Sequence, residues 1–297
     1  MTDQKGHIED EIWFSAVSEE ELAKYDKEAA YAAFQKRVKA QPKSAMRIPA
    51  WMRYAAVVAL LVSVGYFSFK GGQSDVESAF GDIVIEAPQG SRTQMMLPDG
   101  TKVWLNAGSR MSYSQGFGYA VRIVRLVGEG YFEVVHNEQL PFSVESDDVR
   151  VKVLGTKFNF RDYPTDAEAT VALTEGSVAM NSVKYPAEDR LLKPGQRAMV
   201  DKRTGQIHVE GYETSKATQW TNGRLTFDGE PLQEIVRTLE RSYNVEIAIA
   251  DNSLLPLRFY GDFLRQEQTL SEVLDALAAT GKIRYEQKGK NVKLYHP

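Results

Sequence analysis

The sequence has the length and composition of a folded protein with more than one domain. It holds 297 residues, 43% of them hydrophobic, which is room for two or three domains. The formal net charge of -4 provides no overall attraction to nucleic acid, so direct nucleic-acid binding is not predicted. No cysteine is present, which excludes disulfide bonds, thiolate zinc sites and cysteine nucleophiles.

The first segment, 1–48, combines acidic and aromatic residues and ends in a basic run. Leu22, Tyr25 and Ala29 are spaced three and four residues apart, so they fall on one face of a helix. A segment this short cannot bury a core of its own. We therefore expect it to bind a partner through Trp13 and the Leu22/Tyr25 face. The alternative is a loosely ordered tail whose basic end contacts anionic lipid.

The second segment, 49–69, is predicted to be a transmembrane helix. Its apolar part, 54–69, contains no charged and no amide side chain, and a helix over 49–69 spans a hydrocarbon core of about 30 Å. Lysines and arginines precede it and acidic residues follow it, so the positive-inside rule places the N-terminus in the cytoplasm. The alternatives are a buried core helix and a cleaved signal peptide, for which the preceding segment is too long.

After a linker at 70–79, residues 80–212 are predicted to form an all-β domain. Runs of β-forming residues alternate there with turn signals along the whole stretch. The sequence Leu97-Pro98-Asp99-Gly100-Thr101 is typical of a hairpin connection. Proline presets φ at the second turn position, and glycine can adopt a positive φ.

Residues 218–297 change character and are predicted to form a small α+β domain. One apolar helical stripe ends at Asn244, and a second begins with the capping-box pair Thr269 and Glu272 and is expected to end at Gly281. The segments LQEIVRTL and LSEVLDAL repeat each other, and a short strand follows each. A duplicated β-α-β unit is therefore expected.

Residues capable of catalysis or metal binding do not form a recognisable site. The four histidines are scattered and lack metal-ligand spacing. Gly128 and Gly130 follow a strand but lead into another strand, so they lack the helix N-terminus of a phosphate loop. Glu129 and Glu133 are interpreted as solvated side chains of one strand rather than as a glycosidase pair. We predict no enzyme, no cofactor and no metal.

Several segments resemble the FecR family of anti-sigma regulators, in the form found beside polysaccharide- and iron-uptake systems of Bacteroidetes-like bacteria. The resemblance extends from residue 88 to residue 247. Its clearest segments are PQGSRTQMMLPDGTKVWLNAGS at 88–109, VRLVGEGYFEV at 124–134, VKVLGTKFNF at 151–160, LKPGQRA at 192–198 and WTNGRLTFDGEPLQEIVRTLERSYNVEI at 220–247. The last of these is similar to the family's C-terminal domain.

The resemblance implies a single-pass protein of the inner (cytoplasmic) membrane with a periplasmic C-terminus. An outer-membrane TonB-dependent transporter would report its substrate through its periplasmic signalling domain to residues 80–297. Residues 1–48 would then hold or release an extracytoplasmic-function sigma factor. This N-terminal segment matches the family less closely than the rest of the chain does.

We expect the transporter's signalling domain to dock on residues 218–297 by strand addition, because a small two-helix unit often leaves a strand edge free. The candidate contacts are the strand containing Leu225 and Phe227 and the terminal strand from Val292 to Tyr295. One of these outer strands is expected to be the edge.

Two further interpretations stay open. Gly155-Thr156 matches a position at which some FecR-like regulators cleave themselves, by attack of the threonine hydroxyl on the preceding carbonyl. The simpler interpretation, which we favour, is a glycine kink between two strands. The main alternative function is a membrane-tethered, β-rich glycan-binding or adhesion module, which an exposed cluster of Trp and Tyr side chains would favour.

Overall fold

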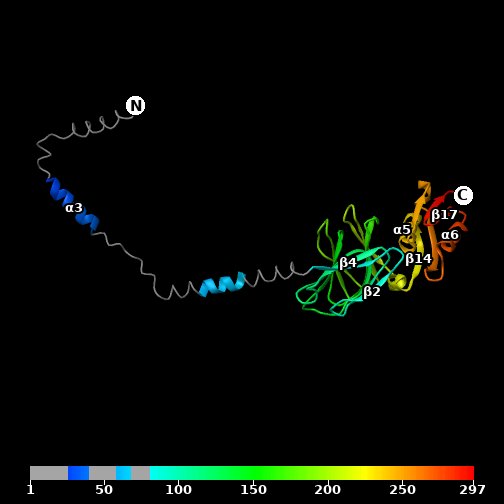
Figure 1. Cartoon of the computed structure of the whole chain (residues 1–297), viewed down its shortest axis with the longest axis horizontal. Helices are drawn as coiled ribbons and strands as arrows, with labels where there is room; N and C mark the ends of the chain where they lie inside the picture. Colours follow the sequence, from blue (N-terminus) through cyan, green and yellow to red (C-terminus); the bar gives the residue numbers. More distant parts are fainter. Residues whose placement is uncertain (1–25, 40–57, 68–80) are drawn as a thin grey trace, which may run out of the picture. The chain divides into compact units, whose positions relative to one another are not determined.

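The computed structural model describes residues 26–39, 58–67 and 81–297, and the chain divides into two compact units, Met1–Phe69 and Lys70–Pro297 (Figure 1). In the first unit, α3 (Lys27–Lys39) begins after Asp26, whose Oδ1 accepts the N–H groups of Glu28 and Ala29. Residues 58–67 form a second helix. The predicted partner contacts Trp13, Leu22 and Tyr25 lie outside the described residues.

The predicted membrane span, 49–69, is described only over 58–67. Among the residues that the structure describes, no helix combines the length and the apolar character needed to cross a membrane.

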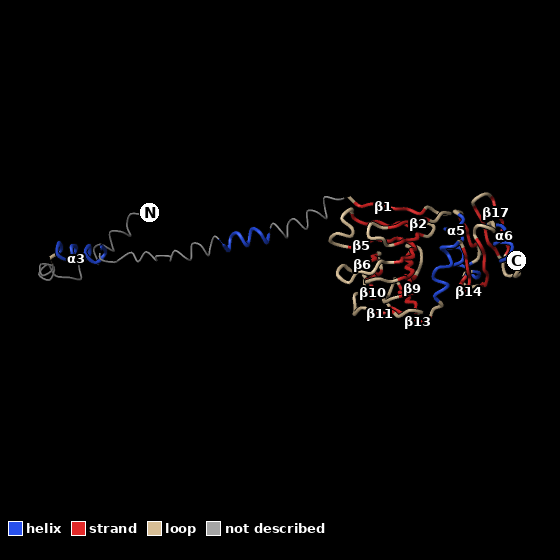
Figure 2. Tube along the Cα trace, turned by 90° about the horizontal axis from the view of Figure 1, so that it is seen from below, coloured by secondary structure: helices blue, strands red, loops and turns tan. Residues whose placement is uncertain are grey.

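The second unit begins with a β-sandwich, as the all-β prediction required. One half of its thirteen-stranded sheet has the order β1-β4-β5-β6-β7-β10-β11, and the other has the order β2-β3-β5-β8-β9-β12-β13 (Figure 2). The strands are β1 (Asp82–Ala87), β2 (Thr93–Met96), β3 (Lys102–Leu105), β4 (Ser109–Ser114), β5 (Arg122–Glu133), β6 (Phe142–Glu145), β7 (Val149–Val153), β8 (Lys157–Asp162), β9 (Glu168–Glu175), β10 (Val178–Ser182), β11 (Arg190–Leu192), β12 (Gln196–Asp201) and β13 (Ile207–Gly211).

Strand β5 belongs to both halves of the sandwich. Its first half pairs with β4 and β6, and its second half pairs with β3 and β8. The chain turns between them at Gly128, which has a φ of 109°. A methyl group built on Gly128 would lie 2.8 Å from Cα of Ser109, so glycine is needed both for the backbone angle and for the close approach. Gly128 and Gly130 therefore form a strand corner.

The inner faces of the two halves share one hydrophobic core. Phe132 of β5 stacks on Phe158 of β8 at 5.2 Å and contacts Phe142 of β6 at 6.1 Å, so the core joins both halves. The predicted hairpin connection is confirmed between β2 and β3. There the N–H of Gly100 donates to the carbonyl of Leu97, and Gly100 has a φ of 85°.

The C-terminal part of this unit contains two helices and two small sheets. Its sheets have the orders β14-β16 and β15-β18-β17, and both contribute to one core with the helices. Its elements are η1 (Thr214–Asn222), β14 (Arg224–Pro231), α5 (Leu232–Tyr243), β15 (Glu246–Ile249), η2 (Asn252–Leu254), β16 (Arg258–Leu264), α6 (Leu270–Ala278), β17 (Arg284–Lys288) and β18 (Asn291–Tyr295).

The helix ends follow most of the sequence predictions. Asn244 terminates α5 in the left-handed conformation with a φ of 54°, and Thr269 and Glu272 form the capping box of α6. The predicted end at Gly281 is wrong, because α6 stops at Ala278. The order β-α-β occurs twice, but each helix joins strands of different sheets. A duplication of the two units stays a prediction.

Replacing Gly128 by alanine should lower the free energy of unfolding of residues 81–297 by about 1–3 kcal/mol, because the side chain strains a positive φ and meets Ser109. Urea unfolding followed by tryptophan fluorescence measures the change. Gly211→Ala is the matched control, since no atom lies within 4 Å of its added methyl group. Equal stabilities of the two variants would contradict the role given to the corner.

Candidate functional site at the α5 junction

The β-sandwich and the C-terminal part meet at a polar junction, which begins with Trp220 of η1. Trp220 is buried against the outer face of β8, where its Nε1 donates to Oδ1 of Asn159 at 2.9 Å. The η1 segment ends at Gly223, whose N–H donates to the carbonyl of Trp220. The indole therefore fixes the connection between the two parts.

Glu129 lies directly beneath this contact. Its Oε1 accepts a hydrogen bond from Nδ2 of Asn159 at 2.9 Å, and its Oε2 accepts one from Nδ2 of Asn106 at 2.8 Å. Glu129 is only 9% exposed, so the interpretation of it as a solvated side chain is wrong. A buried carboxylate needs such donors, and here they come from the turn after β3 and from β8.

The C-terminal end of α5 docks on three turns of the β-sandwich. The carbonyl of Arg241 accepts the N–H of Gly90 at 2.7 Å, which satisfies one of the free carbonyls at the end of the helix. The guanidinium of Arg241 lies 4.0 Å from the ring centroid of Tyr163, and its Nη1 donates to Oδ1 of Asp166 at 2.9 Å. Gly108 lies beside the same side chain. One arginine thus joins the helix to all three turns.

Asp166 is the shared carboxylate of this junction. Arg161 Nη2 lies 2.6 Å from its Oδ2, and Arg237 Nη1 lies 3.9 Å from its Oδ1. Burial acts to raise the pKa of Asp166, but Arg161 and Arg241 outweigh it and hold the pKa below the ordinary value of 3.8. The pKa of Tyr163 is raised, first by burial and then by Glu129.

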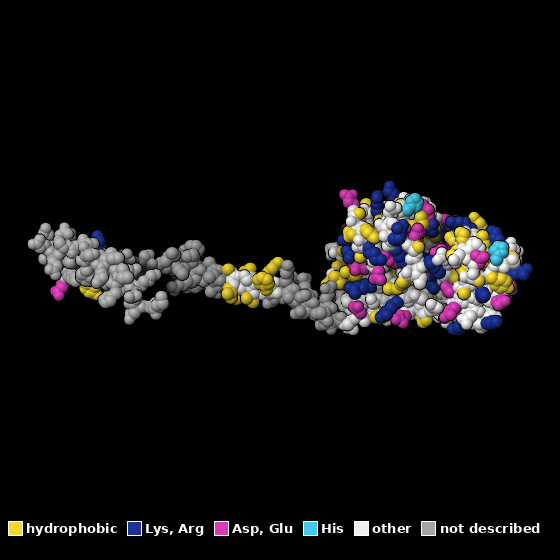
Figure 3. All heavy atoms as spheres, turned by 90° about the horizontal axis from the view of Figure 1, so that it is seen from above, with side chains coloured by type: hydrophobic (Ala, Val, Ile, Leu, Met, Phe, Trp, Pro, Cys, Tyr) yellow, Lys and Arg dark blue, Asp and Glu magenta, His cyan; other side chains and the backbone are white. Residues whose placement is uncertain are grey.

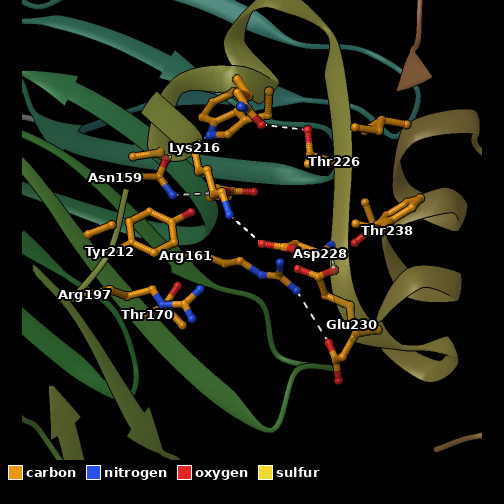
Figure 4. A pocket seen from close by; sticks show the side chains of 18 of the residues that line it. Asn159, Arg161, Thr170, Arg197, Tyr212, Lys216, Thr226, Asp228, Glu230 and Thr238 are labelled. Carbon is orange, nitrogen blue, oxygen red and sulfur yellow. Dashed lines mark hydrogen bonds and ion pairs between the residues drawn. The ribbon is translucent and has the colours of Figure 1, made fainter. Parts of the chain in front are cut away.

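A cleft of about 400 Å³ lies between the outer face of the sandwich and β14 with α5 (Figure 4). Two ion pairs line it: Arg161 of β8 pairs across the cleft with Glu234 of α5 at 3.6 Å, and Lys216 of η1 pairs with Asp228 of β14 at 2.5 Å. The other cations that line the cleft are also paired, Arg197 with Glu210, Arg224 with Asp262 and Arg241 with Asp166. Its chemistry suits a polar contact between the two parts.

In the face drawn in Figure 3, side chains of both signs are interspersed over residues 81–297. Among the residues that the structure describes, no three His, Asp or Glu side chains are arranged to hold a metal ion. Both tryptophans of the described part, Trp104 and Trp220, are at least half-buried, whereas Tyr119 and Tyr185 of the sandwich are exposed, so the glycan-binding alternative stays a prediction.

Gly155 and Thr156 connect β7 to β8. A methyl group on Gly155 would lie 2.6 Å from Cα of His136, so glycine permits a close approach of two chain segments. Thr156 is buried, and its hydroxyl donates to the carbonyl of Ser177 at 2.9 Å. This close approach gives a physical reason for a glycine between the two strands. Self-cleavage stays a prediction.

Of the two predicted docking strands, β14 is an outer strand and β18 is not. Val292 is buried, and Tyr295 lies on β18, which pairs with β15 on one side and with β17 on the other. The expectation that the terminal strand is an edge is therefore wrong. Leu225 and Phe227 are buried in the core on β14, but β14 pairs with β16 alone, so this strand is an outer one and stays a predicted docking edge. Within the described three-stranded sheet, β15 and β17 are the outer strands.

Sequence reasoning misread Glu129 and missed Asp166 and Arg241. The pairing of Asp166 with Arg241 joins positions far apart in the chain, so no local pattern predicts it. The only signals in the sequence are the polar residues within 88–109 and the arginines of α5.

A β-sandwich joined through a polar junction to a two-helix, two-sheet part is a two-part architecture, and the comparisons find the same two parts in a family of regulatory proteins. The model described as "FecR protein" matches residues 83–179, and the one described as "FecR, C-terminal" matches 224–294. Two crystal structures of a candidate anti-sigma factor from Parabacteroides distasonis ATCC 8503, at 1.65 and 2.50 Å resolution, are each 32% identical with a TM-score of 0.67. They cover 72% and 73% of this chain and 99% and 100% of their own.

The chain belongs to the FecR family of anti-sigma factors. A search among curated proteins finds no match.

Replacing Asp166 by asparagine should lower the free energy of unfolding by about 3 kcal/mol at pH 7, because it leaves the partly buried Arg161 and Arg241 without their charge partner. The pKa of Asp166 is lower in the folded protein, so its contribution is present above pH 4 and is lost as pH falls through the folded pKa. The difference in the free energy of unfolding between wild type and Asp166→Asn should therefore become smaller at acidic pH. Urea denaturation at pH 7 and at pH 3 measures this difference, and Asp147→Asn, at an exposed position, is the control. A stability difference that is the same at both pH values would contradict the role given to Asp166.

Proposed function

We propose that this anti-sigma factor relays substrate occupancy of an outer-membrane TonB-dependent transporter to an extracytoplasmic-function sigma factor. In this proposal, residues 49–69 anchor the chain in the inner membrane, 1–48 lie in the cytoplasm and 80–297 lie in the periplasm. Family membership and the charge asymmetry around 54–69 support the arrangement.

The observation that carries the proposal is the open sheet of the C-terminal part. Strand β17 pairs with β18 alone, and four of its five residues are exposed. Lys288 and Asn291 pair across a two-residue loop, so they form a hydrogen-bonded pair and alternate residues of β17 point their N–H groups outward. Tyr285 and Gln287 are therefore the outward donors to which an incoming strand of the signalling domain would bind.

A docked partner would act close to the α5 junction. The sheet containing β17 shares its core with α5, whose last turn contacts the β-sandwich through Arg241. A partner that displaces this sheet would therefore also strain the polar contacts of Arg241 that hold the two parts together. The family's regulatory role requires such a connection between a periplasmic contact and the rest of the chain.

Replacing Gln287 by proline should weaken binding of the transporter's signalling domain at least about tenfold, because proline removes an outward N–H while the pairing of β17 with β18 keeps its other bonds. Titration calorimetry of residues 80–297 against the signalling domain measures the affinity. Gln287→Ala is the matched control, since it loses the side-chain contact with Ser271 but keeps the N–H. Equal affinities of both variants would exclude β17 as the docking edge.

The sigma factor is proposed to bind the aromatic residues of 1–48. The described part of this segment, α3, exposes Tyr31, Phe34 and Val38 at spacings of three and four, which makes one apolar stripe. The Trp13, Leu22 and Tyr25 contacts precede it.

Combined Trp13→Ala and Leu22→Ala changes should reduce capture of the cognate sigma factor by residues 1–48 at least about tenfold, because buried aromatic and aliphatic anchors dominate such interfaces. Lys36→Ala with Lys39→Ala is the control for the basic run, and it should change capture little. Pull-down with graded sigma factor concentrations measures both. If the lysine variant loses more binding than the anchor variant, charge rather than apolar contact holds the partner.

A further inference from the structure

Arg122 gathers several loops at one end of the β-sandwich. It is buried at the start of β5 and bonds to Asp99 at 2.5 Å, to the carbonyl of Val135 at 2.9 Å and to the carbonyl of Leu140 at 3.1 Å. The loop after β7 joins them, because the N–H of Asn137 donates to the carbonyl of Leu154 at 2.7 Å. Loops far apart in sequence thus share one end of the domain.

The chain enters the β-sandwich at this same end. Asp82, the first residue of β1, pairs with Ser114, the last residue of β4, and the β4–β5 loop at 115–121 follows directly and leads into Arg122. In Figure 2, β1 starts at this end and runs toward α5. We call it the entry end, and α5 docks on the opposite one.

The entry end exposes apolar side chains from four separate connections. Tyr119 in the β4–β5 loop is 92% exposed, Met96 at the end of β2 is 63% exposed, Val135 after β5 is 45% exposed and Leu154 after β7 is 42% exposed. His136 and Glu138, in the loop after β5, are exposed at this end as well, so it presents apolar and polar side chains together, as a surface at a lipid–water boundary would.

The chain itself indicates which surface covers them. Residues 70–80 span at most about 40 Å when fully extended, so an anchor at 49–69 holds the entry end within that distance of the bilayer. Tyrosine is favoured at the boundary between lipid and water, because its ring is apolar and its hydroxyl is polar. The described C-terminal part, which would meet the transporter, docks at the other end of the sandwich.

We propose that the entry end is a membrane-contacting surface, with Tyr119, Met96, Val135 and Leu154 resting at the lipid headgroup level of the bilayer that anchors the chain. This inference rests on the membrane anchor of the proposed function. The contact orients the β-sandwich, so that the C-terminal part projects away from the membrane and toward an outer-membrane partner.

The absence of cysteine from the sequence allows a direct test. Full-length Tyr119→Cys and Met96→Cys proteins, each carrying a single NBD fluorophore, are reconstituted into phosphatidylethanolamine–phosphatidylglycerol vesicles. Tyr260→Cys is the matched control, because Tyr260 is 74% exposed but lies on β16 in the C-terminal part. Doxyl-labelled lipid quenches fluorophores at the bilayer, and iodide quenches those in water.

We expect doxyl lipid to quench the labels at 119 and 96 at least about twofold more than the label at 260, with the reverse order for iodide. Equal quenching of all three labels on protein that floats with the vesicles would overturn the membrane contact and leave the anchor intact. Protection from iodide without doxyl quenching would show that protein, such as a second copy, covers the entry end, which also overturns it. Failure of the chain to float with vesicles would remove the anchor and this inference together.

Discussion

The need to satisfy one buried carboxylate organises much of the second unit. Glu129 sits one residue beyond the Gly128 corner, so the strand that joins both halves of the sandwich also carries this charge beneath η1. Its two oxygens take donors from Asn106 and Asn159, and Asn159 in turn accepts the indole of Trp220. Because an unpaired buried carboxylate is very costly, the corner, the turn and the η1 connection are fixed together.

The junction at α5 adds ion pairs to these hydrogen bonds around Glu129. Asp166 receives arginines from β8 and from α5, so a single side chain of the sandwich holds two residues of the helix and one of its own sheet. Several ion pairs to one carboxylate fix the orientation of α5 on the sandwich, yet each of them is a polar contact that can break on its own. Such a junction can hold two parts in one arrangement and still yield to a competing partner more readily than a continuous apolar core would.

Local patterns predicted local structure well. Pro98-Asp99-Gly100 signalled its hairpin, and Asn244 and the Thr269/Glu272 pair signalled helix boundaries, because backbone angles and capping bonds are decided within a few residues. Strand order was not accessible in the same way. Val292 and Tyr295 belong to a sequence-terminal strand that lies inside its sheet, and Glu129 is buried only because η1 folds over it. Both depend on contacts between distant segments, which alternation of residue types does not encode.

The central position of β18 also governs the order in which this part can fold. Strand β15 pairs only with β18, which is made after β16, α6 and β17 have been added to the chain. Until then β15 has no strand partner, although α5 can already pack on β14 and dock on the sandwich through Arg241. A chain made from its N-terminus would therefore complete its sandwich first, with the edge of β15 left unpaired until the last strand inserts.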